Sequence, residues 1–178
     1  MKLYITRHGQ TDWNLNERIQ GKIDIELNDT GRLQAQKIAD LLKDQVIDQI
    51  FSSPLKRATE TAEIINQPHQ LPIQCDERLA ERGFGDYEGT PIEKFDFCGF
   101  WNQALEDQFI SCEKTSAFFA RVYAFIEECR QRFPNQTILV VAHGGVSLPF
   151  YTYAHGIVND HDMRKYMLKN CEVAIYEL

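Results

Sequence analysis

The chain has 178 residues, of which 43% are hydrophobic and 25% charged, and its formal net charge is −7. This length and composition suit one soluble domain with a sizeable core, and the net negative charge argues against a nucleic-acid-binding surface. Any cluster of basic residues in such a chain has to be local, and it would bind a small ligand.

Short apolar runs alternate with segments of helical periodicity, which predicts an α/β fold. Strands are expected at residues 2–6, 46–53, 71–75, 137–143 and 172–178. Helices are expected at residues 30–44, 54–66, roughly 91–107, 115–133 and 144–156. No internal repeat, linker or low-complexity tract interrupts this pattern, so residues 1–178 are expected to form a single domain.

Local signals indicate where three of the helices begin. Thr30 is the expected N-cap of the first helix, and Pro54 is expected at the first position of the second. Pro149 has to lie within the first turn of the helix after residue 143 or to kink that helix. The apolar face of the first helix is expected to consist of Leu33, Ile38, Leu41 and Leu42.

The cellular location follows from what the sequence lacks. The five cysteines are odd in number and widely spaced, which disfavours a disulfide framework or a zinc site and favours the reduced cytoplasm. The N-terminus MKLYITRHG has no long apolar stretch of the kind found in signal peptides. No run approaches the roughly 18 apolar residues of a membrane span, so a cytoplasmic protein without membrane contact is expected.

Polar residues follow three of the expected strands. These segments are Arg7-His8-Gly9, the stretch 53–57 that ends in Arg57, and His143-Gly144-Gly145. Ligands of a parallel open sheet bind outside the carboxyl ends of its strands, and the N-termini of the helices there favour anions. Two histidines and two arginines at one edge would form a cationic pocket of a size for phosphate.

Two other interpretations of these residues remain open. Each histidine could be a structural residue with satisfied hydrogen bonds, and Arg57 could be a solvated helix residue. The two histidines could instead bind a metal, although that site needs a third ligand and leaves both arginines repelling the cation.

The order of these segments resembles the histidine phosphatase superfamily, in its phosphoglycerate-mutase-like branch. The resemblance covers nearly the whole chain, because the other motifs match as well. These are YITRHGQTDWN, QGKIDIELNDTGRLQA, SSPLKRATETA, LAERGFGDYEG and VVAHGG. It implies a three-layer α/β/α sandwich with a mostly parallel central sheet, and a phosphomonoester hydrolase that acts on a small phosphorylated metabolite.

The resemblance also assigns roles to the residues at the strand ends. Chemistry alone cannot choose between His8 and His143 as nucleophile, because both follow a strand and precede glycine; the RHG match selects His8. Neutral imidazole can attack phosphorus near pH 7. Arg7, Arg57 and His143 are then expected to bind the oxygens of the transferred phosphoryl group and to compensate its charge.

The family's general acid matches Glu81, which would protonate the leaving oxygen and later take a proton from water. Without the motif, Glu81 would be read as a surface glutamate; Glu88 is the nearest rival, but it matches the second, structural acid of the box. The resemblance further implies that a group of residues contacts phosphate or shapes the access loop. This group is Gly9, Thr11, Asn14, Gln20, Gly21 and Gly144.

No metal or other cofactor is implied, because the two arginines supply the charge that magnesium supplies in other phosphoryl-transfer enzymes. A mutase must keep water from its phosphohistidine, and mutases of this family carry a long insert between the acid and the second histidine. Only 62 positions separate Glu81 from His143, which favours a phosphatase.

A cofactor-dependent phosphoglycerate mutase and a phosphate-binding module without activity are the alternatives. The oligomeric state and the particular substrate are left open.

A short cap at about 91–113 is expected to cover the site. It contains five aromatic residues, which either form an apolar lid or pack the core: Phe95, Phe97, Phe100, Trp101 and Phe109. Many relatives have Gly-Glu-Ser before the next helix, where this chain has Cys112-Glu113-Lys114, with Arg121 retained. The change puts the local turn and its contacts in question.

Overall fold

A computed structural model describes residues 1–156 and 162–178 of the chain. Five strands form one sheet in the order β3-β2-β4-β1-β5. The four neighbours from β3 to β1 pair in parallel, and β5 runs antiparallel at the edge beside β1. The strands are β1 (Lys2–Arg7), β2 (Gln49–Ser52), β3 (Ile73–Cys75), β4 (Thr137–Ala142) and β5 (Val173–Glu177). The expected mostly parallel sheet is therefore confirmed, although β2 is shorter than predicted.

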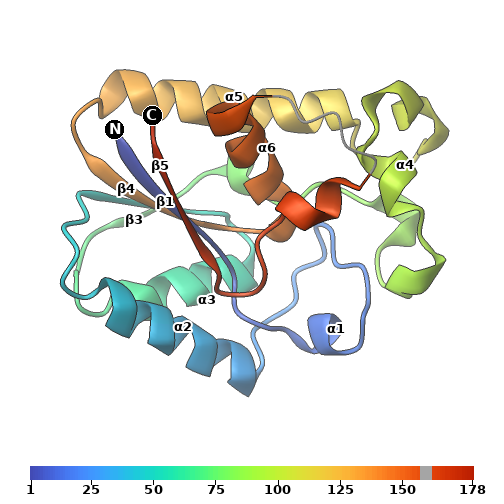
Figure 1. Ribbon diagram of the computed structural model, residues 1–178. Helices are drawn as coiled ribbons and strands as arrows, with labels where there is room; N and C mark the ends of the chain where they lie inside the picture. Colours follow the sequence, from blue (N-terminus) through green and yellow to red (C-terminus); the bar gives the residue numbers. More distant parts are fainter. Residues whose placement is uncertain (157–161) are drawn as a thin grey trace.

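Helices cover both faces of this sheet, so the predicted three-layer sandwich is also confirmed (Figure 1). The α-helices are α1 (Asp12–Leu15), α2 (Asp29–Leu42), α3 (Lys56–Ile65), α4 (Phe97–Trp101), α5 (Thr115–Arg132) and α6 (Gly144–His155). Successive strand residues point to opposite faces: Leu3 and Ile5 pack in the core under α5 and α6, whereas Tyr4 packs in the core with α2 and α3. Among the described residues, no helix is long and apolar enough to span a membrane.

The start of α2 differs from the prediction. Asn28, not Thr30, is the N-cap, and its side chain accepts a hydrogen bond from the backbone N–H of Gly31. The buried face contains Ile38 and Leu42 as expected, but Leu33 and Leu41 are exposed. Gly31, Ala35 and Ala39 take the remaining inward positions, because α2 packs closely against α3 and small residues permit this approach.

The start of α3 also differs, since Pro54 lies before the helix and Leu55 is its N-cap residue. Leu55 has no side-chain hydrogen bond to offer. The first N–H groups are satisfied by other residues instead: Asp24 accepts from the backbone of Lys56 at 2.7 Å, and Ser53 accepts from that of Leu55 at 3.3 Å. A carboxylate from a distant loop thus takes the anion position at this helix end.

Pro149 is the sixth residue of α6, so it lies beyond the first turn, which was one of the two expected alternatives. Proline has no backbone N–H, and the carbonyl group of Gly145, four residues earlier, therefore receives no helical hydrogen bond from residue 149. The side chain of Ser147 donates to the carbonyl oxygen of Gly144 at 2.6 Å, within the same first turns.

The segment 91–113 is less helical than predicted. It consists of α4 between two short 3₁₀ turns, at residues 92–94 and 103–108. Phe95, Phe100 and Trp101 are buried in the core that α5 and α6 cover, and Phe84 stacks on Phe100 with ring centroids 4.4 Å apart. These aromatic residues therefore pack the core at the end of the molecule where α4 lies (Figure 1).

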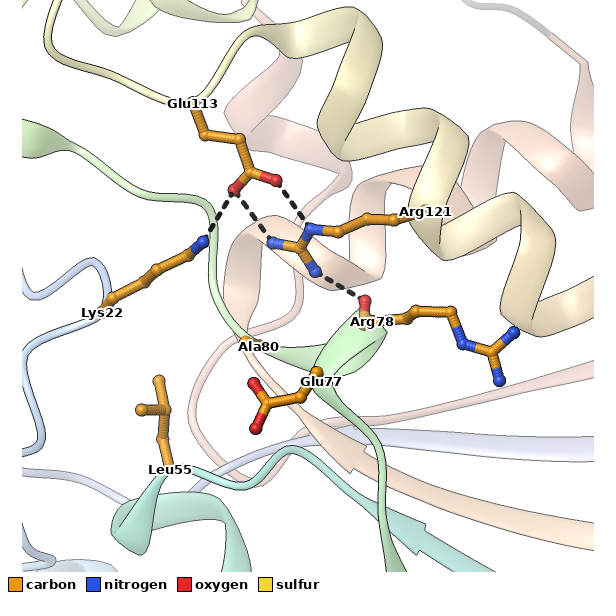
Figure 2. Close-up of a pocket in the computed structure, with 7 residues that line it drawn as sticks. All are labelled: Lys22, Leu55, Glu77, Arg78, Ala80, Glu113 and Arg121. Carbon is orange, nitrogen blue, oxygen red and sulfur yellow. Dashed lines mark hydrogen bonds and ion pairs between the residues drawn. The ribbon is translucent and has the colours of Figure 1, made fainter.

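The altered turn before α5 keeps its glutamate contact. Glu113 forms two hydrogen bonds with Arg121, at 2.7 and 3.0 Å (Figure 2). Lys114, at the position where the resemblance led us to expect serine, is the N-cap residue of α5 and gives it no side-chain hydrogen bond. Glu106 accepts instead from the backbone N–H of Ser116 at 2.9 Å. The Glu113–Arg121 contact is therefore present, whereas the N-cap residue itself provides no side-chain hydrogen bond.

Candidate active site

The predicted site residues come together at the carboxyl ends of β1, β2 and β4. These strands are neighbours in the sheet, so the residues after them are brought side by side. The backbone N–H of His8 donates to Ala142 at 2.9 Å, and that of Ser53 donates to Val141 at 3.0 Å. The rings of His8 and His143 meet edge to face with centroids 5.2 Å apart, and the two residues are only 2% and 1% exposed.

The local contacts of His8 determine where its ring carries a proton. Nδ1 lies 2.7 Å from the carbonyl oxygen of Gly9. A carbonyl oxygen can only accept, so the neutral ring carries its proton on Nδ1 and leaves the lone pair on Nε2. Burial lowers the pKa of His8 well below its usual value, and the charges of Arg57 and Arg7 lower it further.

His143 is hydrogen-bonded through Nε2, whereas His8 is hydrogen-bonded through Nδ1. Nε2 lies 2.7 Å from the hydroxyl oxygen of Ser53, while Nδ1 is buried without a partner among the described residues. Burial lowers the pKa of His143 well below its usual value, and the charge of Arg57 and the neighbouring His8 lower it further. Both histidines are therefore neutral at pH 7 in this structure.

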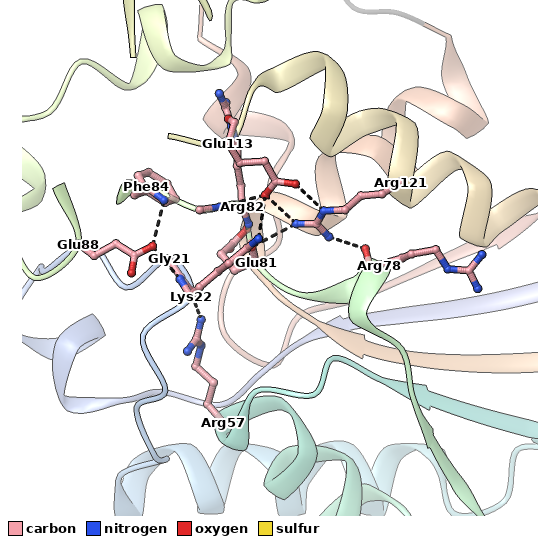
Figure 3. Close-up of polar contacts among 11 residues, drawn as sticks. Gly21, Lys22, Arg57, Arg78, Glu81, Arg82, Phe84, Glu88, Glu113 and Arg121 are labelled. Carbon is pink, nitrogen blue, oxygen red and sulfur yellow. Dashed lines mark hydrogen bonds and ion pairs between the residues drawn. The ribbon is translucent and has the colours of Figure 1, made fainter. Parts of the chain in front are cut away.

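Both arginines are fixed by backbone carbonyl groups. Arg57 is fully buried and donates to the carbonyl oxygen of Gly21 at 2.7 Å (Figure 3). It also donates to the carbonyl oxygen of Ile23 at 2.8 Å. Arg7 donates to that of Leu168 at 3.3 Å. In each arginine the Nε–H group is buried without a partner among the described residues. Burial lowers the pKa of Arg57 to about 10, the carboxylate of Glu81 opposes that change, and the charge of Arg7 adds to it.

Glu81 lies beside these cations and against the N-terminus of α6. Its carboxylate accepts from the backbone N–H of Gly145 at 3.0 Å and of Arg82 at 2.8 Å. Burial lowers the pKa of both Arg7 and Arg57, and the charge of Glu81 partly opposes this change. Its backbone carbonyl accepts from Arg121 at 3.2 Å (Figure 3). In this structure the helix N-terminus that was expected to face phosphate is occupied by the carboxylate of Glu81.

Two glycines of the predicted set have a steric reason to be glycine. A Cβ atom at Gly9 would lie 2.4 Å from the carbonyl oxygen of Gly31, so the segment after β1 can approach α2 only without a side chain. Gly21 has φ +52°, and a Cβ atom there would lie 2.0 Å from the carboxylate of Glu88. Glu88 in turn accepts from the backbone of Lys22 and Phe84, which agrees with its predicted structural role.

Thr11 and Asn14 use their side chains within the access loop. Thr11 accepts from the backbone N–H of Asn14 at 3.1 Å, and Asn14 accepts from that of Thr11 at 3.2 Å, which forms the capping box of α1. Gln20 is nearly buried, and its Oε1 atom has no partner among the described residues. Gly144 begins α6 beside the guanidinium group of Arg7. For Thr11 and Asn14, shaping the loop is the role that the contacts support.

Three residues that hold the pocket together were not predicted as site residues. Ser53 positions His143, as described above. Thr61 accepts from the backbone N–H of Gly9 at 3.1 Å and donates to the carbonyl oxygen of Arg57 at 2.6 Å. Asn170 donates to the carbonyl oxygen of His8 at 2.9 Å. Ser53 and Thr61 lie inside the motif SSPLKRATETA, which was a usable signal, but nothing around Asn170 pointed to this contact.

A metal centre was the main chemical alternative for the two histidines. In the part of the chain that the structure describes, no three His, Cys, Asp or Glu side chains gather in an arrangement that could hold a metal ion. The expectation of a metal-independent reaction stays a prediction.

The fold defines an α/β protein with two histidines and two arginines gathered at the ends of its parallel strands. A sequence profile of the histidine phosphatase superfamily (branch 1) matches residues 3–178. The "Uncharacterized phosphatase PhoE" of Bacillus subtilis is 40% identical over 140 residues, which cover 79% of this chain and 70% of that protein. The chain therefore belongs to the histidine phosphatase superfamily.

Two further comparisons extend over the whole chain. "Phosphoserine phosphatase 1" of Hydrogenobacter thermophilus is 31% identical over 184 residues, which cover 100% of this chain and 85% of that protein. The solved structure of YhfR from Bacillus stearothermophilus superposes with a TM-score of 0.86 at 31% identity, and covers 99% of this chain and 91% of that one. Relatives named as phosphatases support a hydrolase of the histidine phosphatase type.

Proposed function

We propose that this protein hydrolyses phosphate monoesters of small metabolites through a phosphohistidine intermediate on His8. The observation that carries the proposal is a set of unpaired polar atoms around that histidine: Nε of Arg7, Nε of Arg57 and Nδ1 of His143 are buried without partners among the described residues. Buried polar groups without partners are rare and call for an explanation. The oxygens of a phosphoryl group would accept from both arginines.

The chemistry proceeds in two steps that use the same acid. The Nε2 lone pair of His8 attacks phosphorus and the ester P–O bond breaks. Glu81, which takes up a proton when the ester binds beside it, gives that proton to the departing oxygen. Glu81, now a carboxylate, takes a proton from water as the water oxygen attacks phosphorus. The P–N bond breaks, inorganic phosphate leaves, and His8 and Glu81 return to their starting states.

The arginines act throughout by charge compensation. The transferred phosphoryl group carries negative charge that a buried pocket would otherwise destabilise, and preorganised cations stabilise it without reorganisation. Three carbonyl groups on two backbone segments hold Arg7 and Arg57 in place. Phosphoryl charge would also favour the protonated form of His143, which can then donate from both ring nitrogens.

Covalent labelling tests this mechanism. Incubation with a rapidly hydrolysed aryl phosphate, followed by a quench that avoids acid, should trap phosphate in an acid-labile, alkali-stable linkage. His8→Ala should abolish both the label and the turnover, whereas His69→Ala, after the end of α3, should change neither. A fully active His8→Ala protein would rule out the proposed nucleophile. Retained phosphate binding without any turnover of the wild-type protein would identify the alternative, a phosphate-binding module without activity.

A further inference from the structure

The two histidines of the pocket differ in the ring nitrogen that the protein binds. His8 uses Nδ1, which lies 2.7 Å from the carbonyl oxygen of Gly9, and its Nε2 has no partner among the described residues. His143 uses Nε2, which lies 2.7 Å from the hydroxyl oxygen of Ser53, and its Nδ1 is the nitrogen without a partner in the described part of the chain. Nothing in the sequence indicates this difference, because both histidines follow a strand and precede glycine.

The contact of Ser53 with His143 joins residues that follow neighbouring strands. β2 and β4 pair in parallel with Ser52 opposite Val141, and the backbone N–H of Ser53 donates to the carbonyl oxygen of Val141 at 3.0 Å. Both Ser53 and His143 are buried. Buried polar groups are satisfied by protein partners, so the direction of this hydrogen bond follows from the other partners of each atom.

A second contact of the Ser53 hydroxyl group determines that direction. Its oxygen accepts from the backbone N–H of Leu55 at 3.3 Å. The hydroxyl group also has one proton to donate, and within the described residues its acceptor is Nε2 of His143. If Nε2 carried the ring proton, the oxygen of Ser53 would accept twice and its own buried proton would have no acceptor, which is costly. We therefore expect Ser53 to donate and Nε2 to accept.

This direction places the proton of the neutral His143 ring on Nδ1, because a neutral imidazole carries one proton and Nε2 holds the lone pair. The Nδ1–H group then joins the Nε–H groups of Arg7 and Arg57, which are also buried without partners among the described residues. All three atoms are donors, and the negatively charged oxygens of a phosphoryl group are acceptors. A lone pair on Nδ1 would instead repel those oxygens.

We propose that Ser53 determines the different roles of the two histidines: it occupies the Nε2 lone pair of His143, so that His143 donates from Nδ1 to the phosphoryl group and His8 is left as the nucleophile. The inference rests on the proposed function, which places the phosphoryl group on His8. Ser53 is a positioning residue, since it acts through His143. A proton added to Nε2 when phosphate binds would leave this donor in place, because Nδ1 is protonated in both forms of the ring.

The ring of His143 can be observed directly by NMR. Long-range proton–nitrogen correlation spectra distinguish a protonated ring nitrogen from one with a lone pair, and the variant His143→Ala identifies the signals of this residue by their loss. In phosphate-free buffer near neutral pH, wild-type His143 should carry its proton on Nδ1. In Ser53→Ala this preference should be weakened or lost. A wild-type ring with its proton on Nε2 would overturn the inference, whatever the activity of the protein.

Ser53→Ala also tests the effect on the reaction. Loss of the hydroxyl group leaves Nε2 buried without a partner and the position of the ring proton unspecified, so kcat/KM on p-nitrophenyl phosphate should fall about tenfold to a hundredfold. The affinity for inorganic phosphate, measured by calorimetry, should fall as well. Ser52→Ala is the matched control and should leave both close to wild type. Ser52 is equally buried, but its hydroxyl group donates to the carbonyl oxygen of Ser53 at 2.9 Å and not to a histidine.

A second background shows whether Ser53 acts through His143. In His143→Ala the imidazole is absent, so adding Ser53→Ala should lower kcat/KM by at most about a further twofold. Equal losses in the two backgrounds would mean that Ser53 does not act through His143, and would overturn the inference. Thermal melting establishes that each variant is folded, and the wild-type spectra decide the question even if Ser53→Ala does not fold.

The outcomes also separate this inference from the proposed function. A wild-type protein with the proton of His143 on Nδ1, and with a phosphate affinity that depends on Ser53, but without turnover of p-nitrophenyl phosphate, would overturn the proposed function and retain the role of Ser53 in phosphate binding. A wild-type protein that forms the phosphohistidine on His8 but has the proton of His143 on Nε2 would retain the proposed function and overturn the role of Ser53.

Discussion

The buried histidines and arginines of the pocket carry an electrostatic cost that has consequences for stability. Arg7 and Arg57 are charged groups in an environment that lowers the pKa of each, and Glu81 is the acidic group beside them. Desolvating such charges is expensive unless they are paired. His8 and His143 avoid that cost by staying neutral, because burial and the two arginines lower the pKa of each. A bound anion would act in the opposite sense, because its negative charge favours the protonated form of both histidines.

This leads to a prediction on the pH dependence of folding. A histidine whose pKa is lowered in the folded state binds its proton more readily when unfolded, so its stability contribution is intact above about pH 6.5 and is lost as the pH falls below that value. In phosphate-free buffer, the free energy of unfolding should fall by up to about 1.4 kcal/mol per pH unit for each histidine. Urea unfolding between pH 7.5 and 5 measures it.

The variant His8→Gln isolates the contribution of one histidine. It should show a smaller fall in the free energy of unfolding, by about 1 kcal/mol per pH unit in the acid range. Inorganic phosphate should weaken the dependence in the wild-type protein. Parallel pH profiles for the two proteins would show that His8 binds protons equally in the folded and unfolded states.

Glu81 can be tested through the basicity of the leaving group. An aryl phosphate departs as a stable anion, whereas an alkyl phosphate departs as a basic alkoxide that needs a proton. General acid catalysis contributes about 10²- to 10⁴-fold, so Glu81→Gln should lose far more rate on the alkyl ester. Single-turnover phosphorylation of the enzyme isolates this step. Glu88→Gln is the comparison, and it should reduce both rates alike because Glu88 holds backbone N–H groups. Equal losses with Glu81→Gln would make it a positioning residue.

At the scale of elements, strands were more predictable than helix starts. A continuous apolar run such as TILVVA is buried on both faces of a parallel sheet, and this constraint is local in the sequence; β4 accordingly spans Thr137–Ala142. Helix starts depend on whichever group satisfies the first N–H groups. For α3 that group is the carboxylate of Asp24, 32 residues before Lys56, and no local pattern indicates it.

The same distinction applies to the site. His8, Arg57, Glu81 and His143 lie in motifs with a recognisable order, so the sequence could place them in one pocket. The contact of Asn170 with His8 joins residues 162 positions apart. Because it depends on how the chain returns to the sheet before β5, it could be seen only in the folded structure.

The uncapped start of α5 offers a stability prediction. Lys114 gives α5 no side-chain hydrogen bond, and its ion pair with Asp107 is exposed, so replacing it loses little. Lys114→Ser should add a side-chain acceptor for the first turn, where Glu106 already accepts from Ser116, and raise the free energy of unfolding by about 0.5–1 kcal/mol. A rise of about 1–4 °C in Tm would follow for a chain of this length. Lys114→Ala is the control, and equal Tm values for the two variants would contradict the cap.

At the scale of the whole molecule, the question is whether water reaches the phosphoenzyme. The segment 91–113 is short, and Phe95, Phe100 and Trp101 in it are buried in the core under α5 and α6. A mutase needs a site that excludes water until its second acceptor binds, and we expect so short a segment to leave the phosphohistidine accessible to water.

The protein should therefore pass phosphate from His8 to water and not to a second phosphoglycerate. We expect phosphate release to exceed 2-/3-phosphoglycerate interconversion by at least about tenfold, even with the bisphosphate primer supplied, because a hydrated phosphohistidine is intercepted before an acceptor can bind. Both rates can be followed in one reaction by NMR of the phosphorus nuclei. His8→Ala should abolish both, which links them to one intermediate. Isomerisation faster than phosphate release would mean that the pocket closes over the phosphoenzyme, and the cofactor-dependent mutase would then be the correct assignment.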